Sequence, residues 1–261
     1  MATRTTPFAP GTPCWVDLLS SDVAKATTFY TTLFGWTATE PAADFGNYVT
    51  FESDGHVVAG MVPNSADSGS PDVWTTYLST ADIAATVGAA TAAGGQLIVP
   101  AMQVGDLGSM AVVSDPAGAV FGVWQPGSHT GFGKYNEPGS VTWDEVHSKD
   151  FAATLRFYPE VFGWTMEPTS DTDDFRYFTG MIDGERVAGM MDSAAFLPPE
   201  VPSHWAVYFS VADIDAALAK AVELGGSVVR PAEDTPFGRI ADLLDPTGAM
   251  LKLHTALDTA G

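Results

Sequence analysis

One short pattern, Phe-Tyr-x-x-x-Phe-Gly-Trp, occurs twice in the chain, from Phe29 to Trp36 and again from Phe157 to Trp164. Shorter matches flank it at nearly the same spacing: Trp15 with Trp143, Ala59-Gly60-Met61 with Ala188-Gly189-Met190, Asp115-Pro116 with Asp245-Pro246. Self-similarity at a nearly fixed spacing indicates a duplicated folding unit. We therefore expect two equivalent domains, 1–127 and 139–261, joined by a linker over 128–138.

Each half contains the same order of elements twice, a strand, a helix and three strands. In the first copy, residues 14–19 form an apolar run typical of a strand, Ser21 or Asp22 caps a helix, and Gly35 ends it. Asp54-Gly55 predicts a tight hairpin because both residues tolerate positive φ. Pro159 lies inside the helix that begins at Phe151, and predicts that this helix is kinked or shortened relative to its twin. The pattern predicts four βαβββ modules.

Charge and composition limit the partners. The formal net charge is -21, with only 11 Lys and Arg residues. Nucleic acids and anionic membrane surfaces both require concentrated basic patches, so neither is expected as a partner. No run approaches the roughly 18 uncharged apolar residues of a membrane span, and the start lacks the apolar segment of a secretory signal. The single cysteine, Cys14, allows no internal disulfide. We expect a cytoplasmic protein.

Four βαβββ modules, the repeated aromatic pattern and Asp-Pro-x-Gly before the last strand of each half resemble the vicinal oxygen chelate superfamily. This superfamily includes glyoxalase I, bleomycin resistance proteins and extradiol dioxygenases, and the chain looks like its two-domain glyoxalase-like or hydroxylase-like actinobacterial type. The resemblance implies an α+β fold in which each pair of modules forms an eight-stranded, cup-shaped sheet with a ligand inside. Two fused domains already supply the paired modules that smaller members obtain by dimerising, so a monomer is expected, with a dimer as the alternative.

The resemblance also implies where a divalent metal would be held, by His or Glu on the first strand of each module and Glu on the last strand. In this chain those positions carry Trp15, Thr75, Gly122, Trp143, Ala206 and Lys252. None of them is an ordinary metal ligand, so no metal and no cofactor are expected. A displaced divalent-metal site that uses His147, His204 and His254 is the alternative.

Alternation along the strands predicts what fills the two cups instead. If Trp15 and Trp143 point inward, the other inward side chains of the first cup are Asp17, Tyr77 and Trp124, and those of the second are Glu145, His147, His204, Tyr208, Lys252 and His254. We predict that all of these bind the ligand except Glu145, Lys252 and His254, which are candidates for proton transfer because close titratable groups shift one another's pKa. Two alternatives without a functional role stay open. In the first, the tryptophans fill the cups and leave no space for a ligand, and in the second, Glu145 and Lys252 form an ion pair that is only structural.

The predicted function is that of a cup-shaped protein that binds a small, partly aromatic metabolite without the usual metal. It would act as a binding or resistance protein, or as a metal-independent acid–base enzyme. A divalent-metal-dependent lyase or dioxygenase is the alternative from another class. A third reading, in which both cups are plugged, assigns the function to the surface. Fold alone does not choose among these.

Overall fold

The computed structural model describes residues 6–65, 67 and 69–255. The N-terminal half contains β1 (Pro13–Ser20), α1 (Val23–Phe34), β2 (Thr37–Ala38), a short 3₁₀ helix η1 (Ala43–Phe45), β3 (Val49–Ser53), β4 (His56–Pro63), β5 (Val73–Ser79), α2 (Ile83–Ala92), β6 (Gln96–Val104), β7 (Gly108–Ser114) and β8 (Val120–Pro126). The C-terminal half contains β9 (Val141–Ser148), α3 (Phe151–Phe162), β10 (Thr165–Asp171), β11 (Arg176–Ile182), β12 (Glu185–Asp192), β13 (His204–Ser210), α4 (Ile214–Glu223), β14 (Ser227–Thr235), β15 (Gly238–Leu244) and β16 (Met250–Thr255).

The strands form two mixed eight-stranded sheets, in the orders β2-β3-β4-β1-β5-β8-β7-β6 and β10-β11-β12-β9-β13-β16-β15-β14. Each sheet combines two modules, whose first strands lie side by side and antiparallel at its centre, β1 beside β5 and β9 beside β13. The predicted α+β fold with four βαβββ modules is therefore confirmed. The proposed domain limits stay a prediction, and residues 1–5 and 256–261 at their outer ends lie outside the described residues.

Local signals in the sequence have the expected structures. Asp22 caps α1 by accepting a hydrogen bond from the Lys25 backbone N–H, and Gly35 ends this helix in the left-handed conformation. Asp54 and Gly55 both have positive φ in the hairpin between β3 and β4. The helix that contains Pro159 is not shortened, because α3 and α1 both have 12 residues, and a kink at Pro159 stays a prediction. Among the described residues, no helix is long and apolar enough to cross a membrane.

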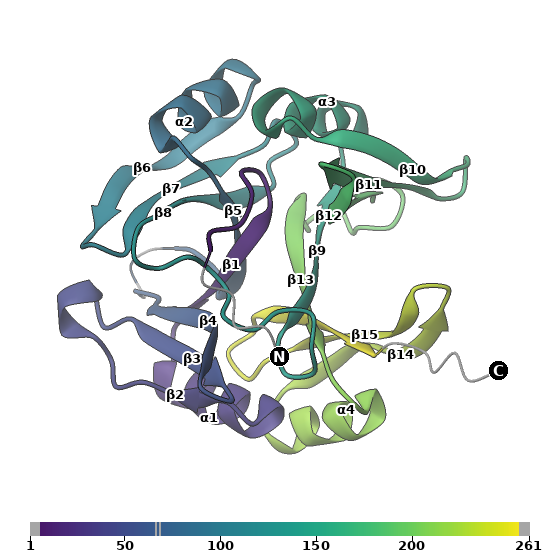
Figure 1. The fold of residues 1–261 in the computed structure, drawn as a ribbon. Helices are drawn as coiled ribbons and strands as arrows, with labels where there is room; N and C mark the ends of the chain where they lie inside the picture. The colour runs from purple at the N-terminus through teal and green to yellow at the C-terminus, as the bar shows by residue number, and fades with distance from the viewer. Residues whose placement is uncertain (1–5, 66, 68, 256–261) are drawn as a thin grey trace.

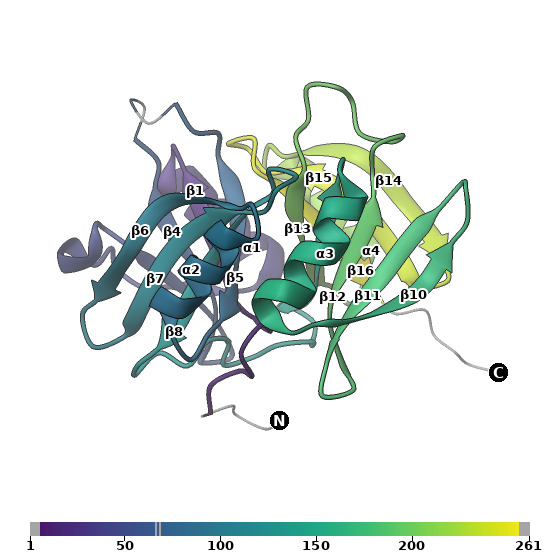
Figure 2. The same ribbon diagram turned by 90° about the horizontal axis from the view of Figure 1, so that it is seen from above.

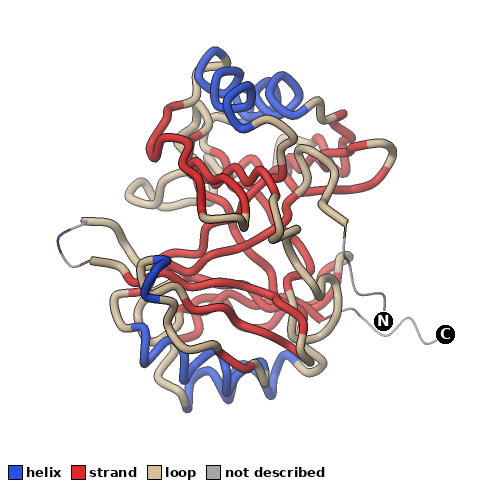
Figure 3. The backbone as a smooth tube through the Cα atoms, turned by 60° about the vertical axis from the view of Figure 1, so that its left-hand side comes forward, coloured by secondary structure: helices blue, strands red, loops and turns tan. Residues whose placement is uncertain are grey.

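The two sheets pack back to back, with one face of each turned toward the other half (Figures 1 and 2). Val16 and Leu18 of β1 lie on this inner face, in a core that also contains Val207 and Phe209 of β13. Helix α1 packs against α4 and α2 against α3. The four helices consequently gather at two opposite ends of the molecule with the strands between them (Figure 3). The opposite faces, which carry Trp15 and Trp143, are called here the N-terminal cup and the C-terminal cup.

The repeated aromatic pattern holds the two halves together. The Tyr30 hydroxyl lies 2.9 Å from Asp245 Oδ2 of the Asp-Pro-x-Gly segment in the other half, and Tyr158 contacts Asp115 in the same way at 3.4 Å. The indole N–H of Trp36 donates to the Gly139 carbonyl. Counting the βαβββ modules in chain order, the Tyr30–Asp245 contact joins the first module to the fourth. The Tyr158–Asp115 contact joins the third module to the second. The pattern that reveals the duplication is therefore part of the interface between the halves, and lies on the face opposite to the cups.

Candidate functional site

The N-terminal cup is organised around the Asp17 carboxylate of β1. Its Oδ1 atom accepts hydrogen bonds from the Trp15 indole, at 2.9 Å, and from the Tyr48 hydroxyl, and Tyr77 also donates to Asp17. Burial raises the pKa of Asp17, although all three hydrogen bonds act in the opposite direction. The polar groups of this cluster thus satisfy one another.

The segment between β8 and β9 covers this cup. The Phe132 ring lies beside Trp15 with centroids 5.6 Å apart, and the His129 ring meets Trp15 edge-on at 4.4 Å. The Trp124 indole donates to the His129 carbonyl. Burial lowers the pKa of His129 to about 4, so this imidazole is neutral at physiological pH. Predicted ligand-binding residues Trp15, Asp17, Tyr77 and Trp124 thus come together, but the chain's own aromatic side chains occupy the space around them.

The C-terminal cup repeats the cluster with Glu145 in place of Asp17. The Tyr208 hydroxyl donates to Glu145 Oε1 at 3.1 Å, Tyr177 also donates to Glu145, and the Trp143 indole donates to the Tyr177 hydroxyl at 3.0 Å. The Trp143 indole therefore reaches the carboxylate only through Tyr177, whereas the Trp15 indole donates directly to Asp17.

Glu145 has a charged neighbour that Asp17 lacks. His147 Nε2 lies 2.8 Å from Glu145 Oε1, at an angle outside hydrogen-bond geometry, so the contact is an ion pair when the imidazole is protonated. Burial alone would raise the pKa of Glu145. The contact with His147 and the charges of His147 and Lys252 outweigh burial and lower the pKa to about 2. Glu145 is therefore a buried carboxylate that is ionised at neutral pH.

Lys252 takes a different partner from the one anticipated. Its Nζ atom donates to Asp242 Oδ1 at 3.0 Å and lies 5.4 Å from the centre of the Tyr208 ring. Arg230 donates to the same Asp242 oxygen. The suggested Glu145–Lys252 ion pair is wrong, because Asp242 on the neighbouring strand β15 is directly opposite Lys252 in the sheet register.

The three histidines divide between the two ends of the cup. At one end the His147 and His204 rings stack with centroids 5.1 Å apart and planes 8° apart. Burial and the charge of His147 lower the pKa of His204 to about 4, and its Nδ1 donates to the Pro202 carbonyl. The loop between β12 and β13 reaches this end, where the Ser193 hydroxyl is 3.3 Å from His147 Nδ1. His254 does not join them.

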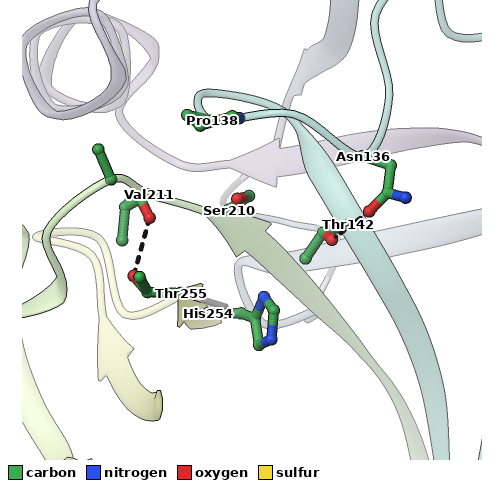
Figure 4. A pocket seen from close by; sticks show the side chains of 8 residues that line it. Asn136, Pro138, Thr142, Ser210, Val211, His254 and Thr255 are labelled. Carbon is green, nitrogen blue, oxygen red and sulfur yellow. Dashed lines mark hydrogen bonds between the residues drawn. The ribbon is translucent and has the colours of Figure 1, made fainter. Parts of the chain in front are cut away.

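His254 lies at the other end, two residues beyond Lys252 on β16. It lines a pocket of about 290 Å³ whose walls are formed by Asn136, Pro138, Thr142, Ser210, Val211, Ala212, His254 and Thr255 (Figure 4). The two edges of the sheet also approach each other above the cup, because Tyr177 of β11 stacks on Phe237 of the β14–β15 turn, with centroids 6.0 Å apart. The Tyr177–Phe237 contact thus bridges the two edges of the sheet above the cup, and the pocket lies at the end that carries His254.

The sequence analysis did not assign Tyr48 and Tyr177 to the site, and it used Gly60 and Gly189 only as part of the repeat. A Cβ atom at Gly60 would lie 1.7 Å from the Tyr48 hydroxyl, and one at Gly189 would lie 2.0 Å from the Tyr177 hydroxyl. The glycines of the two Ala-Gly-Met triplets are therefore needed so that a tyrosine can reach the central carboxylate. Tyr48 precedes Gly60 by the same spacing as Tyr177 precedes Gly189, a signal that was present in the sequence.

The residues at the family's metal positions do not fit a metal. The space beside Gly122 is filled by the Tyr77 ring, which lies 2.1 Å from where a Cβ would be, and Lys252 is bound to Asp242. Within residues 6–65, 67 and 69–255, no group of three or more His, Cys, Asp or Glu side chains is arranged to hold a metal ion.

Comparison with known proteins identifies the family. The chain matches the glyoxalase/bleomycin resistance protein/dioxygenase superfamily over residues 14–123 and 143–253, and it belongs to that superfamily. It is 43% identical to the anthracycline biosynthesis protein DnrV of Streptomyces peucetius, over 94% of this chain and 93% of that protein. It is 37% identical to CFP32 of Mycobacterium tuberculosis, a protein named as a glyoxylase, over 94% of this chain and 95% of that protein.

Solved structures show the same fold at low sequence identity. The Mn(II)-bound glyoxalase from Novosphingobium aromaticivorans superposes with a TM-score of 0.67 at 14% identity, covering 96% of this chain and 83% of that one. The 2,3-dioxygenase LapB from Pseudomonas sp. KL28 superposes with a TM-score of 0.64 at 14% identity, covering 97% of this chain and 94% of that one. At this identity the likeness concerns the fold alone.

Proposed function

We propose that the protein binds a planar, hydroxylated aromatic metabolite in its C-terminal cup, as a binding or resistance protein rather than as a catalyst. The observation that carries this proposal is the contrast between the two cups. Asp17 is enclosed by Trp15, Tyr48 and Tyr77, whereas Glu145 is ionised and has a histidine beside it. The C-terminal cup combines aromatic walls with charged groups, the arrangement typical of a small-molecule site.

The aromatic character of the ligand is supported by the walls of the cup and by one relative. Tyr177 and Tyr208 contact Glu145, and Trp143 contacts Tyr177. Aromatic rings prefer to stack on other flat rings. The relative at 43% identity is named as a protein of anthracycline biosynthesis. Anthracyclines are planar polycyclic aromatic compounds with hydroxyl and carbonyl groups, and ligands of that class would match an ionised carboxylate that accepts hydrogen bonds from phenolic hydroxyls.

Binding is favoured over proton transfer by the pKa of Glu145. An effective general base has a pKa near the working pH. A carboxylate with a pKa of about 2 holds a proton too weakly for that role, and acts instead as a fixed negative charge that orients His147 and hydroxyl donors. The alternative of a divalent-metal lyase or dioxygenase requires a ligand set that the described residues do not form.

The test is a calorimetric titration with 1,4-dihydroxyanthraquinone at neutral pH. We expect the parent protein to bind this probe and Glu145→Gln to weaken binding about tenfold or more, since a hydrogen bond to a charged group is replaced by one to a neutral amide. Asp17→Asn is the matched control, because it makes the equivalent change in the other cup and should leave the affinity unchanged.

Three results would contradict the proposal. Absence of binding to any hydroxylated aromatic probe would remove the function. Loss of affinity in Asp17→Asn, with Glu145→Gln unaffected, would move the site to the N-terminal cup. Conversion of the probe, seen as a time-dependent change in its absorbance spectrum that Glu145→Gln abolishes, would replace a binding protein by an enzyme.

A further inference from the structure

The second βαβββ module carries almost no charge. Between residues 83 and 125, which comprise α2, β6, β7 and most of β8, the only charged residues are Asp106 and Asp115, and Asp115 is buried. The equivalent stretch of the fourth module, 214–255, contains ten Asp, Glu, Lys and Arg residues. The formal net charge of the chain is -21, so the second module is an uncharged region on an otherwise strongly acidic protein.

Strand β6 carries this uncharged region to the outside of the molecule. It is the last strand of its sheet and, among the described strands, pairs with β7 alone. Figures 1 and 2 show it at the periphery, with α2 packed beside it. Its residues 97–102, called here the β6 edge, are Leu-Ile-Val-Pro-Ala-Met, and all except Val99 are exposed. A run of exposed apolar residues on an edge strand favours association unless another surface covers it.

The internal repeat provides a strand of the same shape that is protected by charge. Strand β14 is the counterpart of β6, with the same two register shifts and a proline at the same place. Its residues 228–233 are Val-Val-Arg-Pro-Ala-Glu, followed by Asp234. Arg230 pairs with Asp242, and Glu233 and Asp234 are exposed. Charged side chains on an edge strand keep other chains away, and the β6 edge lacks them.

Charge also indicates which partner fits the β6 edge. A basic partner would be attracted to the acidic surfaces of this protein rather than to an uncharged one. Two copies of the chain repel each other wherever their acidic surfaces face, because like charges brought together at an interface are costly. In a two-fold contact the same surface lies on both sides, and a charge close to the axis meets its own copy. An uncharged apolar edge avoids this repulsion.

We propose that the β6 edge is the interface of a homodimer with two-fold symmetry. The contact is made by the side chains of Leu97, Ile98 and Met102, which are 44%, 49% and 52% exposed in the single chain. Addition of a strand along the whole of β6 is blocked, because two register shifts and Pro100 interrupt it. Burial of these apolar side chains drives the association. The interface is independent of the ligand proposed above.

Sedimentation equilibrium of the full chain over a range of protein concentrations tests this interface. We expect the parent to have a mass about twice the 27.4 kDa of one chain. Ile98→Glu should raise the dissociation constant of the dimer at least about tenfold, because two carboxylates would face each other near the axis. Val229→Glu is the matched control. It makes the same change in charge at the equivalent position of β14, which is 51% exposed, and should leave the dimer intact.

Met102→Glu is the second variant, should Ile98→Glu fail to fold. It installs the residue that the fourth module carries at this position, Glu233, and should also separate the two copies. Added NaCl gives an independent readout. Salt screens the repulsion between two acidic chains, so the parent dimer should become tighter as NaCl is raised, whereas a dimer held by ion pairs would weaken.

Three results would overturn the proposal. A parent that stays monomeric at every concentration has no such interface, whatever other protein covers the β6 edge. A dimer that Val229→Glu dissociates while Ile98→Glu and Met102→Glu leave it intact uses β14 instead. A dimer that NaCl dissociates is held by charged residues and not by the β6 edge. None of these results bears on ligand binding in the C-terminal cup.

Discussion

Asp17 and Glu145 occupy equivalent positions in the two halves, yet burial raises the pKa of Asp17 whereas the pKa of Glu145 is lowered to about 2. The hydrogen-bonding tyrosines are the same in both cups, so they do not cause the difference. The cause is the added charge of His147 and Lys252, whose N-terminal counterparts are the apolar Leu19 and Gly122. Duplication produced two copies of one carboxylate cluster, and substitutions around the second copy kept its carboxylate ionised.

Replacement of Gly60 or of Gly189 by alanine should lower the stability of the protein to a similar extent. Gly60→Ala and Gly189→Ala each place a methyl group within 2.0 Å of a tyrosine hydroxyl. We expect each to lower the free energy of unfolding by about 1–3 kcal/mol, measured by urea denaturation. Gly88→Ala, in the middle of α2 with open space around it, is the control and should raise stability by about 0.5–1 kcal/mol. A neutral Gly60→Ala would show that Tyr48 need not reach Asp17.

Asp144 should make stability depend on pH in the opposite direction from an ordinary carboxylate. It is fully buried between the halves, where its Oδ1 atom accepts the Thr76 hydroxyl at 2.6 Å, and burial raises its pKa from 3.8 to about 7. Between these values the folded protein holds a proton that the unfolded chain has lost. Stability therefore falls as pH rises through this window, by up to about 1.4 kcal/mol per pH unit from this group.

Asp144→Asn isolates that contribution. Asparagine cannot ionise, so the difference in free energy of unfolding between variant and parent should grow from about pH 4 to about pH 7 and then level off. Urea denaturation across this range measures it, and the other titrating groups cancel in the difference. Thr76→Val is a useful companion, because loss of the single hydrogen bond should raise the Asp144 pKa further. A pH-independent difference for Asp144→Asn would mean that the carboxyl is hydrated in the folded protein.

The modules and the inward-facing residues could be predicted from the chain because both depend on local periodicity. Alternation along β9 and β13 placed Glu145, His147 and Tyr208 on one face, and register then brought them together. The partner of Lys252 could not be predicted, because Asp242 lies on another strand and pairs with it only through sheet register. Closure of the N-terminal cup could not be predicted either, because nothing in the sequence around Phe132 indicates that the segment between β8 and β9 folds back over Trp15.

Metal analysis should distinguish this chain from the metal-dependent members of its superfamily. We expect protein purified without chelator or nickel resin to contain substoichiometric Mn, Fe, Ni and Zn, because Trp15, Gly122, Trp143 and Lys252 supply no ligands at the family's positions. Added Mn²⁺ or Zn²⁺ should leave the thermal unfolding midpoint unchanged. A stoichiometric metal that is lost on both His147→Ala and His204→Ala, but kept in His56→Ala, would restore the alternative of a displaced metal site.

Two phenylalanines that border the two cups should differ in what their removal costs. Phe132 is about 1% exposed and packs between Phe8 and Trp15, so Phe132→Ala leaves a cavity in the N-terminal cup and should cost about 3–5 kcal/mol of stability. Phe237 is 58% exposed, and Phe237→Ala should change stability by no more than about 0.5 kcal/mol.

The effect of Phe237→Ala should appear instead in binding kinetics, because the stack of Phe237 on Tyr177 joins the two edges of the sheet over the C-terminal cup. Stopped-flow fluorescence should then show faster association and faster dissociation of 1,4-dihydroxyanthraquinone. Unchanged rates would mean that the ligand enters from the His254 end and never passes the Tyr177–Phe237 contact.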